Sequence, residues 1–169
     1  MIGNDIIDLD QARADSNWKR KGFLDKIFTE NEQQLIFSAD NQELMVWNLW
    51  SRKEAAYKIY NRQSKERFYI PRRLECSSVF SEKNHFFGQV NIERKMYFTR
   101  TSIHGSKIYT EAVTNLNYFQ RITAIAIEDV YKDNYGIPFA YGTNNPVSRT
   151  HHGRFERCIQ LDINSQSRL

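Results

Sequence analysis

The chain has 169 residues, of which 40% are hydrophobic and 26% charged, and these values are typical of a globular protein with a single domain over residues 1–169. No apolar run is long enough to span a membrane. The formal net charge of +4 permits an acidic or phosphorylated partner, but it is too small for the dense basic surface of a dedicated nucleic-acid binder.

The chain opens with a predicted strand over residues 1–9, in which apolar residues surround Asp5. On its own, Asp5 would be an ordinary turn or edge-strand acid. This opening has no signal-peptide pattern, and Cys76 and Cys158 are too few for a disulfide framework or a zinc site. We therefore expect a protein of the reducing cytoplasm.

Two short helices are predicted next. Residues 17–28 begin with a basic turn, Lys19 to Lys21, which opposes the helix dipole and therefore suggests that these charges serve a partner outside the helix. Thr29 and Glu32 form a capping-box pattern, which opens a second helix that ends at Phe37.

The longest predicted helix covers residues 47–60. Its capping pair is Asp40 and Glu43. Glu54 and Lys58 lie four residues apart, so they share one side of the helix, at the margin of an apolar stripe that Lys53 interrupts. The ordinary interpretation is a surface ion pair. Two nearby tryptophans favour another, because a partly desolvated carboxylate and ammonium suit a cation or a phosphate.

The second half of the chain has β character. Alternation of apolar and polar residues predicts strands over residues 75–80, 87–92, 95–103, 107–114, 122–130 and 155–161. Turns are predicted near Lys83-Asn84, near His104-Gly105 and over residues 132–138, a loop over residues 148–154, and a frayed tail at the end. Helices followed by strands predict an α+β fold, with an antiparallel sheet packed against the long helix.

Three groups of residues, far apart in the sequence, are candidates for a functional site: Asp5, the pair Glu54 and Lys58, and the segment His151 to Arg154. Magnesium takes one or two protein carboxylates and completes its octahedron with water and phosphate oxygens. Lysine and arginine neutralise the remaining phosphate charge. Together the three groups of residues are therefore typical of a Mg²⁺–phosphate site.

The motifs around these residues resemble those of the 4′-phosphopantetheinyl transferase superfamily. Residues 3–8, Gly-Asn-Asp-Ile-Ile-Asp, look like its Gly-x-Asp-Ile-x-Glu/Asp opening, and residues 50–58 match its Trp-x-x-Lys-Glu-Ala-x-x-Lys signature. Residues 136–138 resemble its Gly-Lys-Pro turn, and residues 150–154 its Ser-His-Ser-Gly-Arg segment, with Thr150 in place of the serine. Residues 61–63, Asn-Arg-Gln, replace the glycines that usually follow the helix.

The resemblance implies a phosphopantetheinyl transferase fold and a Mg²⁺-dependent reaction that moves phosphopantetheine from coenzyme A to a carrier-protein serine. It implies that Asp5 and Glu54 hold Mg²⁺, and that Glu54, or a water it orients, accepts the serine proton. The implied contacts to coenzyme A come from Lys53, Lys58, His151 and Arg154, the last two at the 3′-phosphate. His104 lies in a similar Ser-Ile-His-Gly segment, but only His151 follows a Gly-x-Pro turn, so we favour His151.

The implied partners are acyl or peptidyl carrier proteins, as in fatty acid or polyketide biosynthesis. An inactive relative that only binds carrier protein or coenzyme A is the alternative. The motif order is that of the small synthases, which implies a homo-oligomer, with a trimer favoured and His151 reaching a neighbouring subunit's Asp5. The middle region, longer than theirs, leaves open a monomer that supplies the whole site.

Overall fold

The structure, a computed structural model, describes residues 1–65, 69–82 and 85–163. Its main element is a five-stranded sheet in the order β1-β5-β4-β3-β2, in which all neighbours are antiparallel. The strands are β1 (Ile2–Asp8), β2 (Glu75–Glu82), β3 (His85–Ile92), β4 (Lys95–His104) and β5 (Lys107–Val113). The opening strand therefore pairs with β5, and Asp5 lies opposite Thr110.

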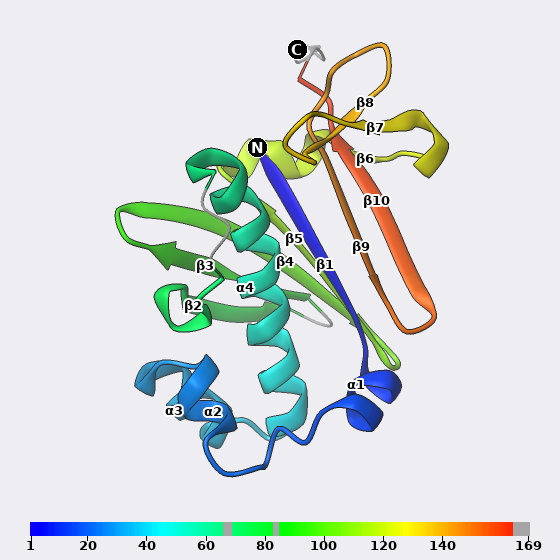
Figure 1. The fold of residues 1–169 in the computed structure, drawn as a ribbon. Coiled ribbons are helices and arrows are strands. Elements are labelled where there is room, and N and C mark those ends of the chain that lie inside the picture. Colours follow the sequence, from blue (N-terminus) through cyan, green and yellow to red (C-terminus); the bar gives the residue numbers. More distant parts are fainter. Residues whose placement is uncertain (66–68, 83–84, 164–169) are drawn as a thin grey trace.

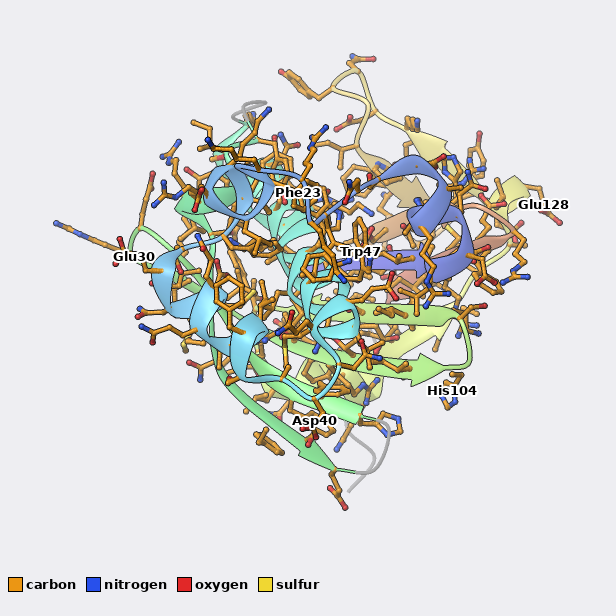
Figure 2. All side chains as sticks on the ribbon, turned by 90° about the horizontal axis from the view of Figure 1, so that it is seen from below. Phe23, Glu30, Asp40, Trp47, His104 and Glu128 are labelled. Atoms are coloured by element: carbon orange, nitrogen blue, oxygen red, sulfur yellow. The ribbon has the colours of Figure 1, made fainter. Side chains whose placement is uncertain are left out.

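Four helices cover one face of this sheet (Figure 1). They are α1 (Leu9–Asp15), α2 (Phe23–Ile27), α3 (Glu30–Ser38) and α4 (Gln42–Ser64). α4 runs across the sheet, and the three short helices lie around its N-terminal end; Figure 2, seen from that end, shows Trp47 between α1 and the pair α2 and α3. The buried face of α4 packs on the sheet in the main core, which fixes the side of α4 that stays accessible.

β1 approaches α4 so closely that only glycine fits at position 3. A Cβ atom on Gly3 would lie 2.0 Å from the carbonyl oxygen of Ala55 and 3.3 Å from a side-chain carbon of Ile59. The carbonyl belongs to the helix backbone and cannot rotate away. This contact therefore sets the level of β1 against α4, and it brings Asp5 to the turn of α4 that carries Glu54.

We expect Gly3→Ala to lower the free energy of unfolding by about 3 kcal/mol or more, because the added methyl group forces β1 and α4 apart. Urea denaturation measures this loss. The control is Gly105→Ala, since a Cβ atom there meets nothing within 4 Å and only the positive φ of 58° is strained. Equal losses in the two variants would contradict the close approach of β1 to α4.

The C-terminal part forms a second, three-stranded sheet in the order β6-β10-β9. Its strands are β6 (Ile122–Ala124), β9 (Val147–His152) and β10 (Phe155–Leu161), and β7 (Val130–Lys132) pairs with β8 (Pro138–Ala140) in a separate ribbon. Three short 3₁₀ helices, η1 (Pro71–Arg73), η2 (Leu116–Arg121) and η3 (Ile127–Asp129), complete the connections. Ile159 and Leu161 of β10 pack on Ile2 and Val113 in a second core.

β9 lies along the outer edge of β1, so that β1 runs between β5 and β9 (Figure 1). The N–H groups of Asn4, Ile6 and Asp8 do not bond to a strand backbone there. They donate to side chains on alternate residues of β9: Ser148 Oγ at 3.0 Å, Thr150 Oγ1 at 3.2 Å and His152 Nδ1 at 3.1 Å. The far end of the chain therefore satisfies the edge of its first strand.

The predicted α+β arrangement is confirmed: antiparallel strands pack against a long helix. The prediction of one helix over residues 17–28 is wrong. Asn17 to Gly22 form turns, Gly22 takes a left-handed φ of 78°, and only α2 is helical. Lys19 to Lys21 therefore lie in a turn and do not oppose a helix dipole. The cap of α4 is Asn41 and not Asp40, because the Asn41 side chain accepts from the Leu44 N–H.

Two β predictions also change. Residues 122–130 break into β6, η3 and β7, and the predicted loop over residues 148–154 is mostly strand β9 with a tight turn at Gly153. The turn predicted at Lys83-Asn84 and the tail from residue 164 lie outside the described residues. In the described part of the chain, no helix is long and apolar enough to cross a membrane.

Candidate active site

α4 presents Glu54 and Lys58 one turn apart at the border of its buried face. Ala55, Ala56 and Ile59 are fully buried beside them, whereas Glu54 is half-buried and the Lys58 side chain is 31% exposed. The packing of the apolar residues fixes the rotation of the helix. Glu54 and Lys58 are therefore held at the margin between core and solvent.

Lys58 connects α4 with β1 and β9. Its ammonium nitrogen donates to the Asn4 carbonyl oxygen at 2.6 Å and to the Arg149 carbonyl oxygen at 3.4 Å. It also lies 3.7 Å from Asp5 Oδ1. Residues 5, 58 and 149, which are far apart in sequence, thus meet at one point of the fold.

Asp5 and Glu54 lie in surroundings that disfavour their charged forms. Burial raises the pKa of Asp5, although Lys58 and hydrogen bonds from Ser51, Thr150 and the Ile6 backbone oppose this rise. Burial, together with the negative charge of Asp5, raises the pKa of Glu54 to about 7, and Lys58 opposes that rise. Burial disfavours the charged form of both carboxylates, Asp5 adds to this effect at Glu54, and Lys58 offsets it, so the pair provides a favourable place for a cation.

The donor set fits magnesium better than a transition metal. Among the residues described, no group of three or more His, Cys, Asp or Glu side chains is arranged to hold a metal ion. Zinc sites use three or four such ligands, whereas Mg²⁺ is commonly held by one or two carboxylates with water and phosphate oxygens. Asp5 and Glu54 are two hard oxygen ligands of that kind.

A cavity of about 500 Å³ opens beside Lys58, between α4, β9 and the turn that connects β7 to β8. Its lining includes Lys58, Arg62, Lys132, Arg149 and His151, and within the described residues no Asp or Glu side chain lines it. Gly136, Ile137 and Pro138 of the connecting turn form part of the wall. The size and the positive charge suit a phosphorylated ligand of nucleotide size.

The structure brings four of the predicted site residues together and separates the other two. Asp5, Glu54 and Lys58 meet as described, and His151 lines the same cavity as Lys58. Arg154 lies at the β9–β10 turn, where its Nε is 3.0 Å from Asp8 Oδ2 and its guanidinium also pairs with Asp10. In this position Arg154 holds the turn to the start of α1, which differs from the predicted contact with a 3′-phosphate.

Lys53 is fully buried and has three partners. Its ammonium nitrogen lies 2.6 Å from Glu32 Oε2, and it donates to the carbonyl oxygens of Ile27 at 2.9 Å and Pro71 at 3.0 Å. Neither Lys53 nor Glu32 has an exposed side chain. The predicted contact between Lys53 and the cofactor does not fit this position, in which Lys53 ties α4 to α3 and η1.

His104 lies elsewhere. It projects from the tip of the β4–β5 hairpin (Figure 2), and it lines a different cavity, together with Lys107, Phe155 and Arg157. The geometry therefore agrees with the preference for His151 over His104 as the histidine near Lys58.

Arg62 belongs to the cavity but was not predicted as a site residue. Its guanidinium donates to the carbonyl oxygens of Pro138 at 3.3 Å and Val147 at 2.6 Å, and it lies over the Phe139 ring at 5.6 Å. Burial lowers its pKa to about 10. The signal in the sequence was the Asn-Arg-Gln triplet in place of glycines, but nothing local indicates that Arg62 fixes the cavity wall.

Aromatic rings shield the Glu54 side of α4. Tyr69 packs against Tyr57 with ring centroids 4.6 Å apart and meets Trp50 edge-on at 5.9 Å. These three rings reduce the access of water to Glu54, which is consistent with burial as the main cause of its raised pKa. Trp50 and Tyr57 are recognisable from helical spacing, but Tyr69 comes from outside the helix.

Comparison with known proteins gives one result. A family model described as the 4′-phosphopantetheinyl transferase superfamily matches residues 1–112. This range runs from β1 into β5 and contains Asp5, Glu54 and Lys58, but it ends before β9 and His151. No curated protein matches the chain.

Proposed function

This chain belongs to the 4′-phosphopantetheinyl transferase superfamily, and we propose that it transfers 4′-phosphopantetheine from coenzyme A to a serine of an apo carrier protein, releasing 3′,5′-ADP. We further propose that residues 1–169 form one domain with the fold of that superfamily, and that the protein acts in the cytoplasm. The observation that carries the proposal is the meeting of Asp5, Glu54 and Lys58 beside a cationic cavity that also contains His151.

Glu54 is the proposed base. The carrier serine Oγ attacks the β-phosphorus of coenzyme A, and the bond from this phosphorus to the oxygen bridging the two phosphates breaks. The electron pair leaves with 3′,5′-ADP, and the serine proton passes to Glu54, directly or through a water. Without a bound cation, burial and Asp5 raise the pKa of Glu54 to about 7, so this carboxylate has a higher proton affinity than an ordinary glutamate, as a general base for the serine proton requires.

Positively charged side chains would stabilise the negative charge on the leaving group, 3′,5′-ADP. Lys58 would contact the phosphates, and His151, Arg62 and Arg149 line the cavity in which the nucleotide would lie. Asp5 and Glu54 would hold Mg²⁺, which supplies charge stabilisation at the phosphate oxygens when bound. Lys58 keeps its own partners on β1 and β9, so its ammonium is already oriented before a substrate arrives.

The test is direct: the purified chain is incubated with an apo carrier protein, coenzyme A and Mg²⁺, and mass spectrometry of the carrier is the readout. A mass gain of one phosphopantetheine that disappears when the carrier serine is replaced by alanine supports transfer. Binding of coenzyme A without a mass gain on acyl or peptidyl carriers would instead favour the inactive binding module.

A basic and partly apolar surface beside α2 is the proposed docking site for the carrier. Lys19, Arg20 and Lys21 line a cavity of about 380 Å³ together with Trp18 and the exposed Phe37. Carrier proteins are acidic helical bundles, so a basic surface with apolar contacts is complementary to them. Arg13, another basic residue near β1, has its guanidinium bonded to Glu43 and Asp10, which reduces its charge toward a partner.

We expect Arg20→Glu combined with Lys21→Glu to raise the KM for the carrier at least tenfold and to leave the KM for coenzyme A unchanged, because the reversed charges repel an acidic partner. Steady-state kinetics with each substrate varied in turn measures both constants. The control, Arg94→Glu with Lys95→Glu at the β3–β4 turn, makes the same change in net charge. Equal rises in both KM values would place the basic turn in the nucleotide site or in the fold.

The contacts of β9 support a site supplied by one chain, one of the two arrangements that the sequence left open. β9 satisfies the edge of its own β1 and brings His151 to the cavity of its own Lys58. A neighbouring subunit is therefore not needed to complete the proposed site. The number of subunits remains a prediction, and light scattering at working concentration determines it.

Mixing of inactive variants tests this arrangement. Because one chain supplies Glu54 and His151 to one cavity, Glu54→Ala and His151→Ala proteins should recover no activity when unfolded together and refolded as a mixture. The transfer assay measures recovery, and a wild-type sample treated in the same way shows how much activity refolding preserves. Recovery of about a quarter of that activity would show that the site lies between subunits, as in the trimer predicted by resemblance.

A further inference from the structure

We propose that Thr150 is a positioning residue for Asp5: its hydroxyl holds the carboxylate in the orientation that receives a divalent cation. This inference rests on the proposed function and extends it to a residue outside the range of the family match, which ends at residue 112. It depends on contacts between β9 and β1.

The hydroxyl of Thr150 acts both as an acceptor and as a donor, and the partner in each hydrogen bond is fixed. Its Oγ1 accepts the N–H of Ile6 at 3.2 Å and donates to Asp5 Oδ1, also at 3.2 Å. A backbone N–H can only donate, so the single hydroxyl proton is left for the carboxylate. Thr150 is 6% exposed and Asp5 is 8% exposed, so water competes little with this bond.

Threonine at position 150 restricts the orientation of this hydroxyl more than serine would. A β-branched side chain in a strand has few accessible χ1 rotamers, so its hydroxyl stays aimed at the carboxylate. Thr150 is held in register by pairing with Arg157 on β10, and by its neighbours Ser148 and His152, which bond to the same edge of β1. The carboxylate of Asp5 is thus oriented by a strand that is itself attached at three points.

Hydroxyl groups also lie on the opposite side of Asp5. Ser51 Oγ and Thr110 Oγ1 are 2.9 Å apart, Thr110 Oγ1 and Thr101 Oγ1 are 2.8 Å apart, and all three residues are fully buried. Thr110 is the strand partner of Asp5. These groups are interior to the sheet and helix, and Ser51 also bonds to Asp5 from that side. Lys58 connects Asp5 to β9 through the backbone carbonyl of Arg149, whereas Thr150 is a side chain of β9 that bonds to the Asp5 carboxylate directly.

This link joins the two parts of the proposed site. Alternation along β9 directs Thr150 toward β1, and the next residue, His151, lines the cavity. A displacement of β9 would therefore change the orientation of Asp5 and the position of His151 together. Outer groups that orient a metal ligand typically change metal affinity or activity by about tenfold to a hundredfold when removed.

The experiment compares three variants of the full chain. Thr150→Val removes the hydroxyl and keeps the shape, and we expect its Mg²⁺ dissociation constant to rise about tenfold or more. Thr150→Ser keeps the hydroxyl, and we expect a value within about threefold of wild type. Ser148→Ala is the matched control, since Ser148 accepts the Asn4 N–H in the same way and, within the described residues, its hydroxyl does not bond to a carboxylate.

Two measurements are made on each protein. Isothermal titration of Mg²⁺ into the complex with coenzyme A gives the metal affinity, and a melting curve without metal gives the stability. Both Thr150→Val and Ser148→Ala should melt lower than wild type, but only Thr150→Val should bind Mg²⁺ more weakly. If Thr150→Val does not fold, Thr150→Ala removes the hydroxyl without placing a methyl group against the Ile6 N–H.

Wild-type Mg²⁺ affinity in a folded Thr150→Val or Thr150→Ala protein would overturn the inference, and so would an equal loss of affinity in Ser148→Ala. In those cases the hydroxyl only satisfies the edge of β1. A wild-type chain that binds neither Mg²⁺ nor coenzyme A would overturn the proposed function itself, and the two failures are therefore distinguishable.

Discussion

Glu54→Gln should lower the rate of phosphopantetheine transfer at least a hundredfold and yet raise the stability of the metal-free protein. The loss of rate follows because the amide can neither accept the serine proton nor hold a cation, and such groups are worth roughly two or more orders of magnitude. The gain in stability follows because the wild-type carboxylate is partly buried and lies near Asp5. Asp5→Asn should lower the rate to a similar extent.

The sign of the stability effect depends on pH. The pKa of Glu54 is raised from 4.5 to about 7 by folding, so the folded chain binds this proton more tightly than the unfolded chain does. Stability from this group is therefore fully present below about pH 4.5 and is lost as the pH rises through about 7. Glu54→Gln removes that loss, so the variant should gain on the order of 2 kcal/mol at pH 8 and almost nothing at pH 4.5.

Thermal melting at pH 4.5 and pH 8 measures this difference, and a gain of on the order of 2 kcal/mol corresponds to a rise of several degrees in Tm. Added Mg²⁺ and coenzyme A should stabilise wild type at pH 8 but leave Glu54→Gln unaffected by the metal. Glu30→Gln is the control, because Glu30 is an exposed acid on α3 (Figure 2). A near-normal transfer rate in Glu54→Gln would refute its role as base and ligand.

Local sequence determined much of this fold. Alternation identified β3, β4 and β5 to within two residues, and the capping box at Thr29 and Glu32 is present as predicted. The four-residue spacing of Glu54 and Lys58 placed them on one side of α4, since helical periodicity requires no tertiary contact. The close approach of Gly3 to the Ala55 carbonyl was not predicted, because it is a contact between segments far apart in the sequence.

The remaining features depend on contacts between distant segments. Arg154 pairs with Asp8 and Asp10, which lie 146 and 144 residues earlier in the chain, and no local pattern predicts that pairing. The start of α2 at Phe23 was not predicted, because the left-handed turn at Gly22 overrides the helix propensity of Lys19 to Lys21. Residues 122–130 were predicted as one strand because a single 3₁₀ turn at η3 leaves little trace in the alternation of apolar and polar residues.

Lys53 shows most clearly how a contact between distant segments decides the role of a residue. The signature motif suggested a contact with the cofactor, whereas the structure buries Lys53 against Glu32, 21 residues earlier in the chain. We expect Lys53→Met to lower the free energy of unfolding by about 3 to 5 kcal/mol, because it leaves the Glu32 carboxylate buried without its cation. The backbone N–H groups of Thr29 and Cys76 still donate to Glu32, but they carry no full charge.

Lys58→Met is the matched comparison, since it makes the same chemical change on the same helix at a partly exposed position. It should change the unfolding free energy by about 1 kcal/mol or less and weaken coenzyme A binding at least tenfold. Lys53→Met should show the reverse pattern: a fall in Tm of roughly 10 °C, with coenzyme A affinity within about twofold of wild type at a temperature where the variant is folded. Calorimetric titration and urea denaturation measure the two quantities. Weakened coenzyme A binding by a stable Lys53→Met protein would mean that the ammonium leaves Glu32 for the cofactor, and the buried ion pair would then not be its functional state.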